Sequence, residues 1–311
     1  MGVTAKWRSA AATHPGRVRA ENQDRSYLDD ELGIFLVVDG LGGHAAGEKA
    51  ADTALEVIRG ELQELGPDIR ERIPRAIAAA NNRILDLAEG NEAWQGMACV
   101  LTLAVAYEDK FIVGHVGDSR LYLFWNGSMR KLTSDHSPVG EREDSGDLSE
   151  QEAMQHPRRH EVFRDVGSRR REPGDADFIE MKEFLFKPDA AILLCSDGLS
   201  DLATASEIRE IVERYDGYPE QVARDLVDAA NQAGGADNIT ALFVAGSQFA
   251  GSSSPGMENA RARHSITRMR LGAGTQPQLG AINRLVRMLT SRPAFLVYGF
   301  LLGVLLAFAV R

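Results

Sequence analysis

Short apolar runs alternate with longer amphipathic stretches from residue 7 to about residue 245. The short runs are rich in β-branched and aliphatic residues, which predicts strands over 34–39, 98–107, 111–116, 120–125, 190–196 and 239–245. The longer stretches repeat their apolar positions at helical spacing, which predicts helices over 46–65, 69–88, 206–215 and 219–232. The sequence has no internal repeat with a period of about 20 to 50 residues, so the pattern indicates one mixed domain.

The strands between 98 and 125 follow one another with very short connections, and residues 108–110 are expected to form a hairpin turn. We therefore expect these strands to be antiparallel neighbours, with the helices covering the outer faces of an α+β fold. Between about 133 and 180 the apolar pattern fades and charged residues dominate. This change predicts an excursion from the core, with one short helix near 149–155.

The formal net charge of -10 hides a division of the chain. Residues 1–246 hold 27 basic and 44 acidic side chains, whereas residues 247–311 hold eight arginines and one glutamate. The acidic part has no basic stripe of the kind that nucleic-acid binding needs, so nucleic acid is not an expected partner. The first 14 residues contain no apolar stretch of signal-peptide length, and export is not expected. Cys99 and Cys195 lie in apolar runs and are expected to be buried thiols.

The C-terminal residues carry a pattern of their own. Residues 247–280 are rich in Gly, Ser, Pro and Gln, which predicts a flexible linker. From Pro293 to Val310 no residue is charged, and Arg292 and Arg311 flank this run. As a helix the run would extend roughly 27 Å, close to the roughly 30 Å of a hydrocarbon core. The alternatives are a buried core helix or the end of an amphipathic hairpin, but an all-apolar helix that follows a linker favours a membrane span.

The tail arginines lie mostly before this run, so the positive-inside rule places the globular part in the cytoplasm. Residues 282–289 carry apolar side chains on one helical face and arginines on others, as an interfacial helix would. The expected organisation is a globular domain over 1–246, a basic linker and juxtamembrane segment over 247–292, and a transmembrane helix over 293–310.

Several aspartates stand directly at the ends of apolar strands, where a carboxylate is costly unless a ligand binds it. Asp39, Asp118 and Asp197 each end such a run, Asp201 follows Asp197 by one helical turn, and Asp237 precedes the strand 239–245. Brought together, like charges repel unless cations neutralise them, and oxygen ligands select magnesium, manganese or calcium. A single Asp-Gly pair is more often a plain turn. Four strand-terminal aspartates favour a metal site, and the EF-hand spacing of a calcium scaffold is absent from the sequence.

Six ordered motifs make the pattern much more specific. They read RVRAENQD (17–24), VVDGLGGH (37–44), GDSR (117–120), LTSDHS (132–137), CSDGLSD (195–201) and ADNIT (236–240). Over about residues 4–246 this set resembles the metal-dependent PP2C-type serine/threonine protein phosphatases, and the loop after Asp39 resembles the bacterial branch. The resemblance implies a four-layer α-β-β-α sandwich with two antiparallel sheets. With the predicted span, it places the protein at the cytoplasmic face of a bacterial inner membrane.

The resemblance also implies roles for individual residues. Two to three divalent cations, Mn²⁺ or Mg²⁺, would activate a water that hydrolyses phosphoserine and phosphothreonine in proteins. Asp39 would bridge two cations, and the Gly40 carbonyl, Asp197 and Asp237 would complete their ligands. Asp24 would join the metal site by holding or orienting metal-bound water, and with Asp39 it would be a catalytic residue. A third, weaker site would use Asp118 and Asp201, and Arg19 would bind the substrate phosphate. The expected substrates are phosphorylated proteins, with a serine/threonine kinase and its targets as partners.

The sequence departs from the family pattern around the proton donor and in the flap, the excursion over 133–180. Leu41 stands where the eukaryotic branch has a histidine, and either nearby His44 or a metal-bound water would have to protonate the leaving group. The family's Pro-x-Arg-Asn run reads Pro157 to His160, and its Arg-Ala-Leu/Val-Gly run reads Arg164 to Gly167. These changes bear on substrate preference, because every metal aspartate is kept. Arginines 169–171 either dock an acidic substrate segment or lie on a solvated loop. The competing function is a membrane-tethered binding module without catalysis, which would have lost at least one of the aspartates.

Overall fold

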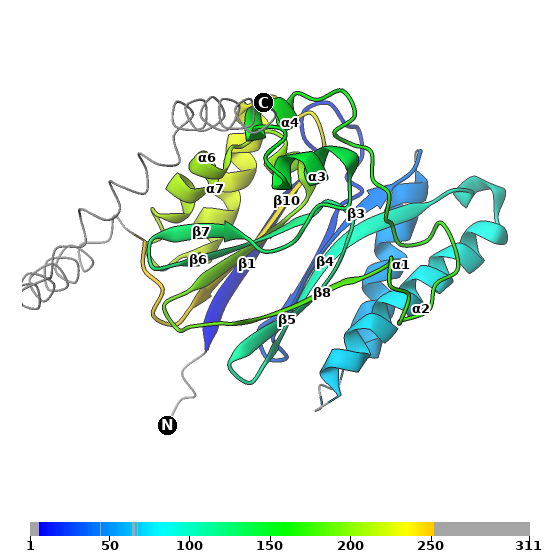
Figure 1. Cartoon of the computed structure of the whole chain (residues 1–311), viewed down its shortest axis with the longest axis horizontal. Coiled ribbons are helices and arrows are strands. Elements are labelled where there is room, and N and C mark those ends of the chain that lie inside the picture. The colour runs from blue at the N-terminus through cyan, green and yellow to red at the C-terminus, as the bar shows by residue number, and fades with distance from the viewer. Residues whose placement is uncertain (1–5, 44, 64–65, 67, 252–311) are drawn as a thin grey trace, which may run out of the picture. The chain divides into compact units, whose positions relative to one another are not determined.

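The computed structural model describes residues 6–43, 45–63, 66 and 68–251 of the 311-residue chain. These residues form two five-stranded antiparallel sheets that pack face to face, with helices outside them (Figure 1). The predicted linker and juxtamembrane segment (247–292) lies outside the described residues from residue 252 on, and the predicted membrane span 293–310 lies wholly outside them. Among the residues described, no helix is long and apolar enough to cross a membrane.

The first sheet, called sheet A, joins the N-terminal strand to the last strand of the domain. Its order is β1 (Trp7–His14), β10 (Ile239–Gly246), β9 (Ala191–Cys195), β6 (Arg120–Trp125) and β7 (Ser128–Lys131). Sheet B has the order β2 (Arg25–Asp29), β3 (Ile34–Leu41), β4 (Ala98–Tyr107), β5 (Lys110–Val116) and β8 (Glu180–Leu185). Every strand pair in both sheets is antiparallel, which confirms the predicted fold class.

Each sheet has its own helical layer, so the domain has three apolar layers between four layers of structure. The helices α1 (Ala45–Glu61) and α2 (Ile69–Glu89) cover sheet B, and α6 (Ala205–Val212) and α7 (Pro219–Gln232) cover sheet A (Figure 1). Between the sheets, Phe35 and Phe111 meet Leu194 and Leu242 in a fully buried cluster. The four predicted helices and the α-β-β-α order are confirmed. Both cysteines are buried and unpaired, as expected.

The chain leaves sheet B after β5 and enters sheet A at β6, so the expectation that all strands from 98 to 125 would be neighbours is wrong. β4 and β5 do pair across the predicted hairpin, but β6 pairs with β7 and β9. The crossing is made at Gly117, whose φ of +106° belongs to the region that favours glycine. A Cβ at this position would overlap the Val100 side chain. Short connections alone therefore do not separate a hairpin from a crossing between packed sheets.

The flap contains the predicted short helix and one more. α4 (Glu150–Met154) begins with a capping box between Ser149 and Glu152, and α3 (Pro138–Asp144) begins at the N-cap Ser137.

The remaining short elements lie outside the flap. A 3₁₀ turn (Glu92–Trp94) precedes β4, and a short helix α5 (Asp197–Ser200) follows β9. After β10, Phe249 packs against Tyr215 and Phe243, so the described core continues slightly past the last strand.

Candidate metal centre

The strand-end aspartates converge where the two sheets meet, at one end of the sandwich. Asp39 lies in β3 of sheet B and Asp118 follows β5, whereas Asp197 begins α5 after β9 and Asp237 precedes β10 of sheet A. These four side chains line one cleft of about 520 Å³. Arg19, Gly40, Leu41, His160 and Asn238 also line it. The structure thus brings together residues that are nearly 200 positions apart in the sequence.

The carboxylates are close enough to perturb one another. Burial, followed by the negative charges of Asp24, Asp197, Asp118 and Asp237, raises the pKa of Asp39 well above its usual range. Gly40 beside it packs so tightly against the backbone of Gly47 in α1 that any side chain there would overlap it. The cleft therefore concentrates negative charge that the protein needs a cationic ligand to neutralise.

Asp24 lies beneath the cleft and is nearly inaccessible to solvent. Its Oδ2 accepts hydrogen bonds of 2.7 Å from the hydroxyls of Ser196 and Thr240. Its Oδ1 is buried and has no hydrogen-bond partner within the described residues. The pKa of Asp24 is raised to about 7, and burial is the largest cause. The two hydroxyl bonds lower this pKa, whereas the negative charges of Asp197 and Asp237 raise it further. A buried carboxylate oxygen left unpaired beside other carboxylates fits a site for divalent cations and their water.

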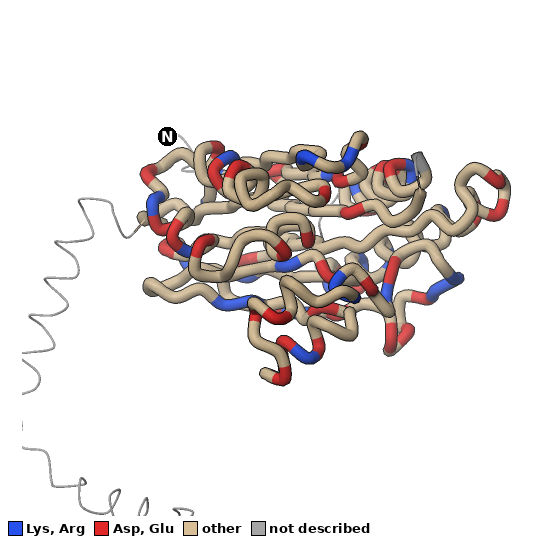
Figure 2. Tube along the Cα trace, turned by 90° about the horizontal axis from the view of Figure 1, so that it is seen from above, with Lys and Arg blue, Asp and Glu red and all other residues tan. Residues whose placement is uncertain are grey.

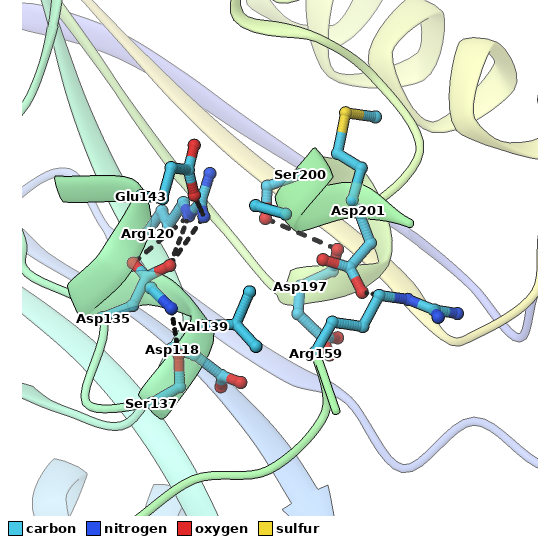
Figure 3. Close-up of a pocket in the computed structure, with 13 residues that line it drawn as sticks. Asp118, Arg120, Asp135, Ser137, Val139, Glu143, Arg159, Asp197, Ser200 and Asp201 are labelled. Carbon is cyan, nitrogen blue, oxygen red and sulfur yellow. Dashed lines mark hydrogen bonds and ion pairs between the residues drawn. The ribbon is translucent and has the colours of Figure 1, made fainter. Parts of the chain in front are cut away.

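Asp118, Asp197 and Asp201 surround a second, smaller cavity of about 20 Å³, which has room for one water-sized species (Figure 3). Asp201 also accepts a hydrogen bond of 3.0 Å from Arg159 Nε of the flap. Burial first, and then the charge of Asp197, raises the pKa of Asp201 to about 7. Asp118 and Asp201 thus face one cavity, as the third-site prediction requires, but Asp201 already has a cationic partner.

His160 belongs to this site, although no role was predicted for it from the sequence. Its Nδ1 lies 3.5 Å from Asp197 Oδ2 and 3.6 Å from Asp201 Oδ2, so the flap supplies an imidazole to the carboxylate cluster. The hydrogen bond to Asp197 is the main cause that raises the pKa of His160. The signal was present in the sequence, because this position departs from the family's asparagine. Leu41 lines the cleft as well, whereas His44 lies outside the described residues.

Arg19 projects from the loop before β2 and reaches the same cleft. Its Nη2 donates a hydrogen bond of 2.9 Å to Asp237 Oδ2, and 57% of the side chain is exposed. Asn238 holds the loop in place, because its Nδ2 donates to the carbonyls of Pro15 and Glu21 and its Oδ1 accepts from the Gln23 amide. An exposed guanidinium at the edge of a carboxylate cluster is well placed to meet a phosphate.

The three consecutive flap arginines do not face this cleft. Arg169 and Arg171 pair with Asp177, and Arg170 pairs with Asp86 of α2. Acidic and basic residues lie interspersed along the described chain (Figure 2). Arg169 and Arg171 thus pair within the flap, and Arg170 attaches the flap to α2.

The fold and the site together define a class of protein: a four-layer α-β-β-α sandwich with a cleft of buried and half-buried aspartates at one end. The chain belongs to the protein phosphatase 2C family, whose model matches residues 16–231, and it is a protein serine/threonine phosphatase. It is 33% identical over 242 residues to the serine/threonine phosphatase stp of Listeria innocua, a match that covers 75% of this chain and 93% of the relative.

Solved structures agree with this assignment. The crystal structure of the Mycobacterium tuberculosis serine/threonine phosphatase PstP/Ppp matches with a TM-score of 0.69 and 29% identity over 77% of this chain and 98% of that one. The catalytic domain of PstP, solved in complex with two manganese ions, matches with a TM-score of 0.68 and 28% identity over 77% of this chain and 97% of that one.

Proposed function

We propose that the aspartate cleft holds two to three divalent cations, Mn²⁺ or Mg²⁺, and hydrolyses phosphoserine and phosphothreonine in proteins with water. The observation that carries this proposal is the group of mutually perturbed carboxylates around the unpaired Oδ1 of Asp24. The two manganese ions bound to the PstP catalytic domain support it. A divalent cation, when bound, supplies a Lewis acid that neutralises phosphoryl charge and lowers the pKa of water.

The proposed roles follow from where the side chains lie. Asp39, the Gly40 carbonyl, Asp197 and Asp237 would hold the cation pair, because they line the cleft from both sheets. Asp24 would orient water with its unpaired oxygen, while Ser196 and Thr240 fix its other oxygen.

Arg19 would donate hydrogen bonds to the phosphoryl oxygens of the substrate at the mouth of the cleft. Asp118 and Asp201 would hold the third cation across the small cavity, with His160 beside them. At the position of Leu41 there is no proton donor, so the proton that the leaving group needs would come from water in the cleft.

The proposal is tested with the purified full chain, stripped by chelator and assayed on a phosphothreonine peptide with and without Mn²⁺. Asp39→Asn and Asp237→Asn are expected to lower Mn²⁺-dependent turnover by more than about 100-fold, because losing a ligand exceeds the 10–100-fold cost of changes around a metal site. Asp216→Asn, on an exposed loop, is the control and should behave as wild type. A folded chain that binds Mn²⁺ yet turns over no phosphopeptide would instead support the binding module.

We also propose that residues 293–310 anchor the enzyme in a membrane, with the phosphatase domain on the cytoplasmic face of a bacterial inner membrane. The uncharged run and the arginines before it support this proposal. Tethering would raise the effective concentration of the enzyme toward membrane-associated substrates, among them a serine/threonine kinase and its targets.

We expect the full chain to sediment with membranes and to resist extraction by high salt. A chain truncated after Gly251 should be soluble and keep its turnover on a phosphothreonine peptide. Salt-extractable full-length protein would show that the tail binds peripherally, and equal rescue of all phosphorylation by both forms in a deletion strain would show that the anchor does not select substrates.

A further inference from the structure

One motif has no place in the proposed catalytic roles: LTSDHS, residues 132–137. In the structure this segment lies where the flap leaves sheet A after β7. The Thr133 hydroxyl accepts a hydrogen bond from the Leu121 amide, and Ser137 is the N-cap of α3. Ser134 bonds through its amide and hydroxyl to the Glu180 carboxylate in β8. The segment thus contacts both sheets and the flap.

Asp135 attaches the segment to a buried ion pair. It receives three hydrogen bonds from the guanidinium of Arg120, the first residue of β6 after the Asp118 turn, and Arg120 also pairs with Glu143 of α3 at 2.6 Å (Figure 3). The flap helix, the 132–137 segment and the strand that follows Asp118 are therefore held by one guanidinium. Breaking such a buried pair leaves an uncompensated charge, so these three parts are expected to move together.

His136 bonds directly to the turn that carries Asp118. Its amide donates to the Gly117 carbonyl at 2.7 Å, and the Gly117 amide donates to His136 Nδ1 at 3.0 Å. Both polar groups of the Gly117 backbone are thus fixed by one residue. Gly117 has a positive φ, a backbone conformation that favours glycine. The two bonds from His136 hold this conformation and thereby set the direction of the chain one residue before Asp118.

The opposite side of His136 contacts a later part of the flap, at Phe163 and Arg164. Its carbonyl accepts a hydrogen bond of 3.0 Å from the Phe163 amide, its ring lies against the Phe163 ring, and Arg164 Nη1 approaches Nε2 at 3.4 Å. Phe163 and Arg164 follow His160, which reaches the carboxylate cluster. A single buried residue therefore joins the flap segment around Phe163 to the Asp118 turn.

We propose that His136 is a positioning residue that couples the flap to the cation site through its Nδ1 bond to Gly117. The inference rests on the proposed role of Asp118 as a cation ligand. A flap displaced by substrate would shift Phe163, then His136, and then the turn before Asp118. Changes to groups around metal ligands typically cost 10–100-fold in metal affinity.

The test compares two substitutions of His136, each of which places a side-chain amide group near the position of one of the two ring nitrogens. In His136→Asn the side-chain oxygen occupies the position of Nδ1 and can still accept from Gly117, whereas in His136→Gln the amide reaches toward the position of Nε2. We expect Mn²⁺ titration of the full chain, followed by electron paramagnetic resonance, to show the weakest Mn²⁺ site close to wild type in His136→Asn and weakened about 10-fold or more in His136→Gln. Tryptic cleavage of the flap after Arg158, Arg159 and Arg164 should be faster in His136→Gln than in wild type or His136→Asn.

Equal Mn²⁺ binding and equal flap cleavage in the two variants would overturn the proposal, since packing alone would then explain His136. Thermal unfolding of both variants checks that the proteins being compared are folded. Asp118→Asn separates this inference from the proposed function. If Asp118→Asn binds Mn²⁺ as wild type does, the ligand role of Asp118 fails, while the flap cleavage rates still decide whether His136 holds the flap.

Discussion

At the scale of single residues, the aspartates of the cleft differ in how the chain compensates their charge. Asp201 is paired with Arg159 and Asp237 with Arg19, whereas Asp24 accepts hydrogen bonds from the neutral hydroxyls of Ser196 and Thr240. The aspartates at strand ends could be predicted from the sequence, because an apolar run that stops at a carboxylate marks a special environment. Ser196 and Thr240 lie within two of the sequence motifs, but their hydrogen bonds to Asp24 could not be predicted, since only the fold brings residues 196 and 240 to residue 24.

His160 shows a second limit of local patterns. It reaches Asp197 and Asp201 only because the flap folds back over the sheet ends, and no spacing rule links residue 160 to residues 197 and 201. His136 was likewise visible as part of a motif, but its role depends on a contact with Gly117 that only the folded chain creates.

The stability of the fold is expected to depend on pH through His136. Burial, with the charges of His115 in β5 and Arg164 in the flap, lowers its pKa from 6.5 to about 3, against the opposing charges of Glu180 and Asp135. The neutral ring is favoured in the fold, so its contribution is complete above pH 6.5 and is lost as the pH falls toward 3. Between pH 7 and pH 5 this corresponds to about 2 kcal/mol of unfolding free energy.

Urea unfolding of wild type and His136→Asn at both pH values measures this contribution, because asparagine does not titrate. Between pH 7 and pH 5, the free energy of unfolding should fall by about 2 kcal/mol more in wild type than in the variant. Parallel losses in the two proteins would show that His136 titrates normally in the fold.

At the scale of elements, the sequence predicted the inner strands and missed the outer ones. The six predicted strands correspond to β3, β4, β5, β6, β9 and β10, whereas the missed strands β1, β2, β7 and β8 are the edges of the two sheets. Inner strands are buried on both faces and form continuous apolar runs, as β10 does. Edge strands keep polar residues at one side, as β8 does with its sequence EMKEFL. Apolar runs therefore identify the middle of a sandwich better than its margins.

The turn between β5 and β6 should tolerate no side chain. Gly117→Ala is expected to combine the strain of a positive φ, about 1–2 kcal/mol, with an overlap with Val100. Gly146→Ala is a matched control, since Gly146 has a φ of +80° but open space around it. Thermal unfolding should show a larger loss for Gly117→Ala than for Gly146→Ala. Equal losses would mean that the Val100 contact relaxes freely.

At the scale of the whole molecule, the cleft joins two sheets whose inner faces meet through apolar contacts. Asp39 comes from sheet B, while Asp197 and Asp237 come from the ends of sheet A strands. Cations held there would link the two halves of the sandwich. Without them, the mutual repulsion of the carboxylates opposes packing at that end.

Divalent cations are therefore expected to stabilise the whole domain. Mn²⁺ at about 100 times its dissociation constant should raise the free energy of unfolding by about 2.7 kcal/mol. For a domain of this size, this corresponds to a rise of roughly 5–10 °C in Tm. Asp39→Asn should melt above wild type when both are metal-free, because one repelling charge is gone, and should gain less from Mn²⁺. Differential scanning calorimetry with chelator or Mn²⁺ measures both effects, with Asp216→Asn as control; identical shifts in all three proteins would place Mn²⁺ binding away from Asp39.

The place of β10 between β1 and β9 has a consequence for synthesis on the ribosome. Sheet B can pair its first four strands once residue 116 has been made, whereas β1 has to wait for its neighbour until residues 239–246 emerge. Asp237 precedes that same strand, so the last of the proposed cation ligands arrives together with the closure of sheet A. The nascent chain therefore carries no assembled cleft until nearly the whole domain exists, and a translation product that ends before residue 237 is expected to remove no phosphate from cellular proteins.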